Sequence, residues 1–231
     1  MDNKHRLGVI IVAAGKSERM NGIDKIFALL QGKTLLEWSV DTCQECKLVQ
    51  QIIIVLDKNK LKAGQELKEK KGWTKVTSIC AGGHRRQDSV VEGLRRLHNS
   101  NWVMIHDGAR PFLSMSLIQK GIETAIQNKG AAIAAIPVRD TIKITNDTGI
   151  VMETLPRNLL WAVQTPQIFS FDLITRAYEE LTSDVTDDAH AVEHLGYSVK
   201  IYIGSYNNIK VTTQEDLISA EVIAQTMASE P

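Results

Sequence analysis

The sequence predicts an α/β fold: a doubly wound, mostly parallel, Rossmann-like sheet with a projecting β-hairpin arm. Up to residue 137, short apolar runs alternate with segments of helical periodicity, which is the pattern of parallel strands joined by crossover helices. Over residues 138–164 this alternation gives way to two short strand-forming runs around a polar turn. We therefore expect a single domain over residues 1–231, with residues 138–164 as the arm.

The expected elements follow from the spacing of apolar residues. Before the arm, strands are expected over residues 9–14, 52–56, 76–80, 102–105 and 131–136, and helices over residues 35–43, 58–71, 90–97 and 117–126. Beyond the arm, helices are expected over residues 171–181, 187–195 and 214–227, and strands over residues 199–203 and 209–211.

The arm is predicted from residues 141–144 and 150–153, which flank the turn-forming residues 145–149. A hairpin that projects from a domain has exposed strand edges, which proteins tend to cover. We therefore expect the arm to contact a second copy of the chain in a homodimer.

The composition argues against a broad electrostatic surface. The chain has 27 basic and 27 acidic side chains and no formal net charge, so a general nucleic-acid or membrane-surface binder is not expected. The apolar run at residues 9–14 is too short for a transmembrane segment or for most signal peptides. These features predict a soluble, cytoplasmic protein.

Two spacings suggest metal or redox chemistry. Cys43 and Cys46 form a Cys-x-x-Cys pair, but they fall near the end of an expected helix rather than at a strand-to-helix junction, which favours structural thiols. His190 and His194 have the spacing of an inverted zinc-peptidase motif, but no further ligand is evident and Asp187 resembles a helix cap. We expect neither a redox pair nor a zinc site.

The turn after the first expected strand is the best candidate nucleotide site. Ala13, Ala14 and Gly15 are small enough to leave backbone N–H groups open to a base or a phosphate. The cations that follow are Lys16, Arg19 and Lys25. A P-loop is excluded because Ile10 stands where that motif needs glycine, and the glycines of a dinucleotide fingerprint are also missing. The alternative is an ordinary strand-to-helix turn.

Two further strand ends carry polar residues. After residues 76–80, Gly83 permits close backbone approach, and Arg86 and Ser89 offer donors at a helix start, although Asp88 or Ser89 can instead serve only as a helix cap.

After residues 102–105, Asp107 is the best metal ligand candidate, because Mg²⁺ shared with phosphates needs only one or two carboxylates. The alternative is an ion pair between Asp107 and Arg110. Lys210 is a point charge suited to a phosphate, or else a solvated lysine.

Together these segments resemble one family, 2-C-methyl-D-erythritol 4-phosphate cytidylyltransferase of the non-mevalonate isoprenoid pathway. The segments that carry the resemblance are Ala13-Ala14-Gly15-x-x-x-Arg19-Met20, Lys25, Gly82-Gly83-x-x-Arg86-x-x-Ser89-Val90, His106-Asp107-Gly108-Ala109-Arg110-Pro111, Val138-Arg139-Asp140-Thr141, Leu160-Trp161-x-x-Gln164-Thr165-Pro166-Gln167 and Asn208-Ile209-Lys210. The resemblance implies a nucleotidyltransferase fold and a CTP-dependent transfer, in which the methylerythritol phosphate attacks the α-phosphorus of CTP in line.

The resemblance also implies roles for individual residues. Arg19 and Lys25 match cations that stabilise the transition state at the α-phosphate, with Lys210 as a further catalytic cation and Lys16 on the triphosphate. The positions that match the CTP site are Ala13, Ala14, Gly15, Lys16, Gly83, Arg86, Ser89 and Asp107, with Asp107 near the ribose and Mg²⁺. The positions that match the methylerythritol phosphate site are Arg110, Thr141, Arg157, Thr165 and Lys210. Thr141 and Arg157 lie on the arm, so the resemblance implies that they complete the partner subunit's site.

Three positions depart from the family pattern. Asp24 stands where many members have proline, which predicts a looser loop before Lys25. His84 replaces a common acidic residue and is not assigned to the base. Asn207 stands where some relatives have aspartate, which leaves Asp107 as the expected carboxylate for Mg²⁺.

Two alternative functions remain open on the sequence. A ribitol 5-phosphate cytidylyltransferase shares the fold and much of the CTP site, although the segments around Thr141 and Trp161 look more like the methylerythritol enzyme. A CTP-binding regulatory module is a second alternative, against which the transition-state cations Arg19 and Lys25 argue.

Overall fold

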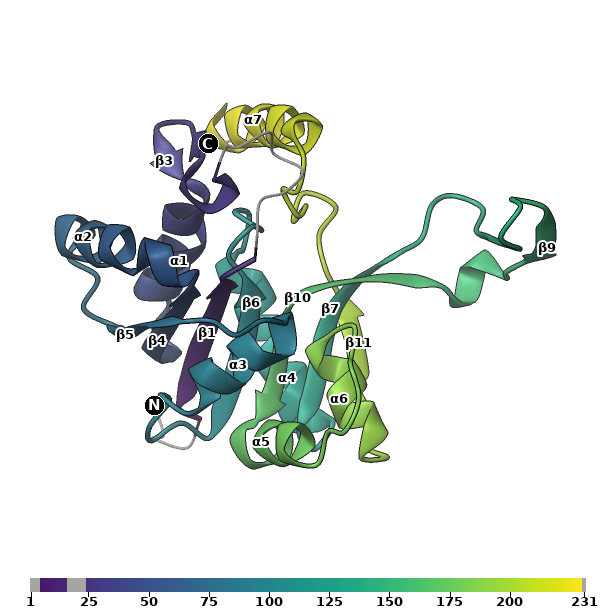
Figure 1. Cartoon of the computed structure of the whole chain (residues 1–231), viewed down its shortest axis with the longest axis horizontal. Helices are drawn as coiled ribbons and strands as arrows, with labels where there is room; N and C mark the ends of the chain where they lie inside the picture. Colours follow the sequence, from purple (N-terminus) through teal and green to yellow (C-terminus); the bar gives the residue numbers. More distant parts are fainter. Residues whose placement is uncertain (1–4, 16–23, 230–231) are drawn as a thin grey trace.

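The computed structural model describes residues 5–15 and 24–229. A seven-stranded sheet forms the centre of the molecule, with strand order β11-β7-β10-β6-β1-β4-β5 (Figure 1). Its strands are β1 (Leu7–Ala13), β4 (Val49–Leu56), β5 (Val76–Ala81), β6 (Trp102–Asp107), β7 (Ala131–Pro137), β10 (Trp161–Ser170) and β11 (Lys200–Ile203). β1 is parallel to β4 and β6, β4 is parallel to β5, and β7 is parallel to β11, whereas β10 is antiparallel to both of its neighbours. The predicted mostly parallel α/β sheet is therefore confirmed.

Helices cover both faces of the sheet, as the doubly wound pattern predicted. On one face lie α1 (Leu35–Glu45), α2 (Leu61–Lys71) and α4 (Met115–Gln127), and on the other lie α3 (Arg86–Leu94), α5 (Phe171–Glu179) and α6 (Asp188–His194). A last helix, α7 (Gln214–Ser229), packs on the small hairpin of β2 (Leu29–Leu30) and β3 (Lys33–Thr34).

The central strands are buried on both sides. In β1, Val9 and Ile11 point into the core cluster under α1 and α4, whereas Ile10 points into the cluster under α3 and α5. This continuous apolar run is typical of a parallel strand with helices on both faces, since every side chain must then be apolar. The carboxyl ends of β1, β4, β5 and β6 consequently meet along one edge of the sheet.

The antiparallel strand β10 lies in the middle of the sheet and was not expected from the sequence. Pro166 argues against a central strand because it has no N–H to donate. The structure accommodates it where the pairing of β10 with β7 shifts, between Val163 and Gln167. The C-terminal end of the expected arm, residues 161–164, thus belongs to the central sheet.

The expected strand at residues 209–211 is wrong. This segment makes a backbone hydrogen bond from Val211 to Ala109, and its side chains Ile209 and Val211 pack in the cluster beneath α7. Its apolar residues therefore serve packing between loops rather than a sheet.

The predicted hairpin arm is present. It consists of β8 (Lys143–Thr145) and β9 (Val151–Thr154), which pair antiparallel and project away from the sheet (Figure 1). Asn146 forms the turn by accepting hydrogen bonds from the backbone N–H groups of Thr148 and Ile150. Ile150, Val151 and Met152 are more than half exposed, which leaves an apolar surface on the arm.

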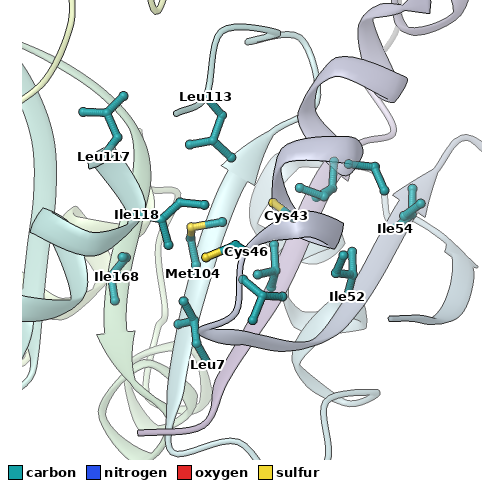
Figure 2. Packing of buried hydrophobic residues seen from close by; sticks show 14 of the residues in the cluster. Leu7, Cys43, Cys46, Ile52, Ile54, Met104, Leu113, Leu117, Ile118 and Ile168 are labelled. Atoms are coloured by element: carbon teal, nitrogen blue, oxygen red, sulfur yellow. The ribbon is translucent and has the colours of Figure 1, made fainter. Parts of the chain in front are cut away.

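Cys43 and Cys46 lie in the core between α1 and the sheet, next to Leu7 and Met104 (Figure 2). Both thiols are buried, and burial raises the pKa of Cys43 well above its ordinary value. The protonated, water-excluded thiol of Cys43 is neither a nucleophile nor a metal ligand, and Cys46 packs beside it in the same core cluster, which agrees with the structural role predicted for the pair.

Within residues 5–15 and 24–229, none of the helices combines the length and the apolar character needed to cross a membrane.

Candidate active site

A cavity of about 500 Å³ opens at the edge where β1, β4, β5 and β6 end. The predicted residues Ala13, Ala14 and Gly15 form part of its wall beside Lys25. The complete lining is Val12, Ala13, Ala14, Gly15, Lys25, Ile26, Asp57, Gly83, His84, Arg85, Arg86, Ser89, Asp107, Ala109 and Lys210. The structure thus brings together the polar segments that follow separate strands in the sequence.

A second cavity of about 330 Å³ adjoins the first. Its lining is Arg86, Asp107, Arg110, Val163, Gln164, Thr165, Gln167, Thr186, Asp187 and Lys210. Arg86, Asp107 and Lys210 line both cavities and therefore form a common wall. Two ligands, one in each cavity, would meet at this charged wall.

Asp107 is the centre of the common wall. Its carboxylate lies 3.2 Å from Arg86 Nε, 2.7 Å from Lys210 Nζ and 3.8 Å from Arg110 Nε. Burial alone would raise the pKa of Asp107, but the charges of Arg86, Lys210 and Arg110 outweigh it and hold the pKa well below its usual value. The alternative ion pair with Arg110 is therefore present, and it is the longest of three.

Lys210 reaches Asp107 from the segment after β11. Asn208 is fully buried, and its side-chain amide donates to the backbone carbonyl of Thr165 at 2.7 Å. The backbone carbonyl of Asn208 in turn accepts a hydrogen bond from Arg110 Nη1 at 2.8 Å. These contacts fix the segment on β10 and on the loop after β6, so Lys210 is not merely a solvated lysine.

His106 and Thr165 hold the backbone at Asp107 and Arg110 through hydrogen bonds. The buried imidazole of His106 contacts the Thr165 hydroxyl at 3.1 Å and the carbonyl of Arg110 at 3.0 Å, and the Thr165 oxygen accepts from the backbone N–H of Asp107 at 3.0 Å. Burial lowers the pKa of His106 to about 4, so the ring is neutral near pH 7. A neutral ring that donates from Nε2 to the Arg110 carbonyl accepts the Thr165 proton at Nδ1.

The turn before α3 both caps the helix and lines the larger cavity, the two roles that the sequence left open. Asp88 caps the helix by accepting from the backbone N–H of Arg85 at 2.9 Å. Ser89 is buried, and its hydroxyl accepts from the backbone N–H of Gly83 at 3.2 Å, within the cavity wall. A Cβ on Gly83 would lie 2.3 Å from the Cβ of Asp88, so only glycine fits there.

Asp24 anchors the residues next to Lys25 instead of loosening them. Its carboxylate accepts from the backbone N–H of Ile26 and pairs with Lys60 Nζ at 2.8 Å. It thereby caps the short 3-10 helix η2 (Lys25–Phe27), which begins at Lys25. A Cβ built on Gly15 would lie 3.8 Å from Lys25 Nζ, so the ammonium group lies beside the first turn in the cavity wall. The rest of the loop for which looseness was expected, residues 16–23, lies outside the described residues.

The remaining predicted residues lie elsewhere. Thr141 and Arg157 are exposed on the arm and line neither cavity of their own chain, and Arg157 Nη1 donates to the carbonyl of Arg139. Lys16 and Arg19 lie outside the described residues.

Sequence reasoning missed several residues of the site. Asp57 directly follows β4 and lines the larger cavity, and it could have been found by the same rule of strand ends. His84, which was named from the sequence but not assigned to the base, lines this cavity too. Gln167 and Asp187 line the smaller cavity, and they were not expected there because β10 was not recognised and Asp187 was interpreted only as a helix cap.

The two histidines of the zinc-peptidase spacing contact each other on α6. The rings of His190 and His194 have centroids 4.7 Å apart and are tilted by 36°. In the part of the chain that the structure describes, no cluster of three or more His, Cys, Asp or Glu side chains is arranged to hold a metal ion.

Comparisons with known proteins agree with this geometry. The family model IspD, described as 2-C-methyl-D-erythritol 4-phosphate cytidylyltransferase, matches residues 7–226. A protein of this name from Dehalococcoides mccartyi is 46% identical over 94% of this chain and 96% of its own length. Another from Alkaliphilus oremlandii is 43% identical over 98% of each chain.

Solved structures show the same relationship. The crystal structure of 4-diphosphocytidyl-2C-methyl-D-erythritol synthase from Anaerococcus prevotii is similar with a TM-score of 0.84 and 34% identity, covering 96% of each chain. That of 2-C-methyl-D-erythritol 4-phosphate cytidylyltransferase from Thermus thermophilus has a TM-score of 0.75 at 29% identity, covering 94% of this chain and 98% of its own. The resemblance inferred from the sequence motifs is confirmed, and this chain belongs to the IspD family of 2-C-methyl-D-erythritol 4-phosphate cytidylyltransferases.

Proposed function

We propose that this chain transfers CMP from CTP to 2-C-methyl-D-erythritol 4-phosphate, giving 4-CDP-2-C-methyl-D-erythritol and pyrophosphate. It is a cytidylyltransferase by its family. The observation that carries the proposal is the wall of Arg86, Asp107 and Lys210 shared by two cavities. Transfer of a nucleotidyl group between two anionic substrates requires that cations hold their phosphates close together. Arg86 and Lys210 supply these cations at the wall.

The larger cavity takes CTP in this proposal. The small residues Ala13, Ala14, Gly15 and Gly83 admit the nucleotide, and Ser89 supports the Gly83 turn. Arg86 and Asp107 lie at the end of the cavity that faces the second substrate. Lys16, by its resemblance, holds the triphosphate.

The smaller cavity takes the methylerythritol phosphate. Arg110 and Lys210 provide positive charge for its phosphate, and Thr165, whose hydroxyl is bonded to His106 and to the Asp107 backbone, lines the cavity beside them. Its phosphate oxygen attacks the α-phosphorus, the bond to the pyrophosphate oxygen breaks, and no covalent enzyme intermediate forms. Lys25 and Lys210, with Arg19 by resemblance, stabilise the charge of the transition state, so catalysis rests on positioning and charge neutralisation.

Mg²⁺ fits the donor set of the common wall. Asp107 is a single carboxylate among cations, and Mg²⁺ in phosphoryl-transfer sites is held by one or two carboxylates together with substrate phosphates. In this proposal Asp107 and the phosphates of CTP hold the ion, which supplies Lewis-acid charge stabilisation when bound.

Pyrophosphate release from CTP and Mg²⁺ tests the proposed function, with methylerythritol phosphate and ribitol 5-phosphate supplied in parallel. Release with the first alone is expected, because the relatives are methylerythritol phosphate enzymes. Release only with ribitol 5-phosphate would transfer the substrate assignment to that sugar phosphate. CTP binding without release from either would indicate a regulatory module.

Asp24→Ala is expected to lower kcat about threefold to tenfold, since losing a cap and a partly buried ion pair costs about 1 kcal/mol locally and the catalytic Lys25 follows directly. Steady-state pyrophosphate release as a function of CTP concentration measures kcat and shows that the KM for CTP changes less. Asp172→Ala, at an exposed position on α5, is the matched control and should leave kcat unchanged. An unchanged kcat in Asp24→Ala would contradict the anchoring role.

The active unit in this proposal is a homodimer formed through the arm. The exposed apolar residues Ile150, Val151 and Met152 give the arm a surface to bury, and Arg157 lines no cavity of its own chain. Thr141 and Arg157 then complete the second-substrate site of the partner.

Mixing two inactive variants tests this sharing of sites. Arg157→Ala and Lys25→Ala are each expected to lose most activity, the first by about tenfold or more in kcat/KM for methylerythritol phosphate. Subunit exchange between them should restore activity, because one of the two sites in the mixed dimer is intact. If arms act on their own subunit, no mixed dimer has an intact site and activity is not restored.

A further inference from the structure

Behind the common wall lies a buried carboxylate that none of the roles above uses. Asp188 is the first residue of α6, and its side chain is 0% exposed. One carboxylate oxygen lies 2.7 Å from Arg86 Nη2, and the other accepts a hydrogen bond from the Tyr178 hydroxyl at 2.5 Å. A buried carboxylate is costly unless both of its oxygens are paired, and here both are.

Arg86 is thereby held between two carboxylates on separate elements. Its Nε contacts Asp107 at the end of β6, and its Nη2 contacts Asp188 on α6. Burial lowers the pKa of Arg86, but Asp188 and Asp107 outweigh it and raise the pKa above its ordinary value. Contacts on two sides of a planar guanidinium fix both its position and its orientation.

The start of α6 is itself fixed from the sheet. Gln167 on β10 is 1% exposed and makes two contacts there, donating to the Asp187 carboxylate at 2.9 Å and accepting from the backbone N–H of Ala189 at 3.0 Å. Asp188 lies between these two residues, so its backbone has little freedom. Tyr178 on α5, whose pKa burial and Asp188 raise well above its ordinary value, stays a hydrogen-bond donor.

We propose that Asp188 is a positioning residue: supported by Tyr178, it holds the Arg86 guanidinium in the wall between the two cavities. In that position the guanidinium contacts the phosphates of CTP. This inference rests on the proposed function of that wall. Without Asp188, the only remaining carboxylate on Arg86 among the described residues is Asp107. Arg86 then turns toward Asp107 and competes there with Lys210.

The test is a double-mutant cycle on CTP binding, measured by calorimetry with CTP and Mg²⁺ and without the second substrate. Asp188→Asn and Arg86→Gln are each expected to weaken CTP binding about tenfold, the size of one charge-assisted hydrogen bond. The double variant should bind no more than about twofold more weakly than Arg86→Gln alone, because Asp188 acts only through Arg86. Multiplying losses, or an unchanged affinity in Asp188→Asn, would overturn the proposal.

Tyr178→Phe is a second, milder variant, which we expect to fold because it keeps the buried ion pair between Asp188 and Arg86 and removes only one hydroxyl. It should weaken CTP binding about threefold, and this loss should disappear in the Arg86→Gln background. A loss that persists there would also overturn the proposal. Glu193→Gln on the exposed face of α6 is the matched control and should bind CTP like the wild type.

A separate readout distinguishes this inference from the proposed function. Wild-type protein that binds CTP but releases no pyrophosphate with methylerythritol phosphate contradicts the proposed function, while the binding cycle still reports on Asp188. Wild-type protein that turns over normally while the cycle shows independent losses contradicts the inference alone.

Discussion

Lys25→Ala is expected to lower kcat for cytidylyl transfer by about 10²- to 10³-fold, the effect typical of removing one preorganised charge from a transition state. The KM for CTP should change by less than about threefold. The reason is position: Lys25 begins η2, is anchored by Asp24, and places its ammonium group beside Gly15 in the wall of the larger cavity. A cation there neutralises charge that grows at the α-phosphate as the new bond forms.

The measurement is steady-state pyrophosphate release over a range of CTP concentrations, together with calorimetric CTP binding. Lys58→Ala is the matched control, because Lys58 is exposed on η3 (Lys58–Lys60) and does not line either cavity. Lys25→Arg should recover part of kcat by keeping the charge. Equal losses in kcat and in CTP affinity would mean that Lys25 binds the ground state as strongly as the transition state.

The sequence predicts the parts of the site that follow parallel strands. Ala13, Gly83 and Asp107 come after three strands that are far apart in the chain, and the parallel arrangement brings the strand ends to one edge. Because apolar runs locate such strands well, the residues that follow them could be placed before the structure was known.

The parts contributed by β10 and α6 could not be predicted in the same way. The central strand β10 is not recognisable from the sequence, because its pattern is neither alternating nor continuously apolar. It contains Pro166 and the polar residues Gln164 and Gln167, which are not typical of a central strand. Asp188 gives no local signal either, because its burial depends on Arg86 and Tyr178, which are distant in sequence. Tertiary ion pairs of this kind are visible only when the elements are packed.

Asp107→Asn is expected to have the second large effect, lowering kcat/KM for both substrates by about 10²-fold or more. Among the residues that the structure describes, Asp107 is the carboxylate that Arg86, Arg110 and Lys210 share. Removing its charge leaves these cations to repel one another at the wall between the cavities and removes the proposed Mg²⁺ ligand. The free energy of unfolding should fall by about 3 kcal/mol at pH 7, as for a broken buried ion pair.

The difference in unfolding free energy between the wild type and Asp107→Asn depends on pH, and this dependence gives the sharper test of the variant. The surrounding cations hold the pKa of Asp107 below its unfolded value, so its stabilising contribution is complete above the unfolded pKa, about 3.9, and is lost only as the pH falls toward the folded pKa. The difference in unfolding free energy between wild type and Asp107→Asn, measured by urea denaturation, should therefore stay constant from about pH 8 to 5 and narrow below about pH 4. Asp172→Asn, at an exposed position on α5, should show no such difference. A difference that instead narrows between about pH 8 and 6 would assign the stabilisation to a group with a higher pKa than this carboxylate.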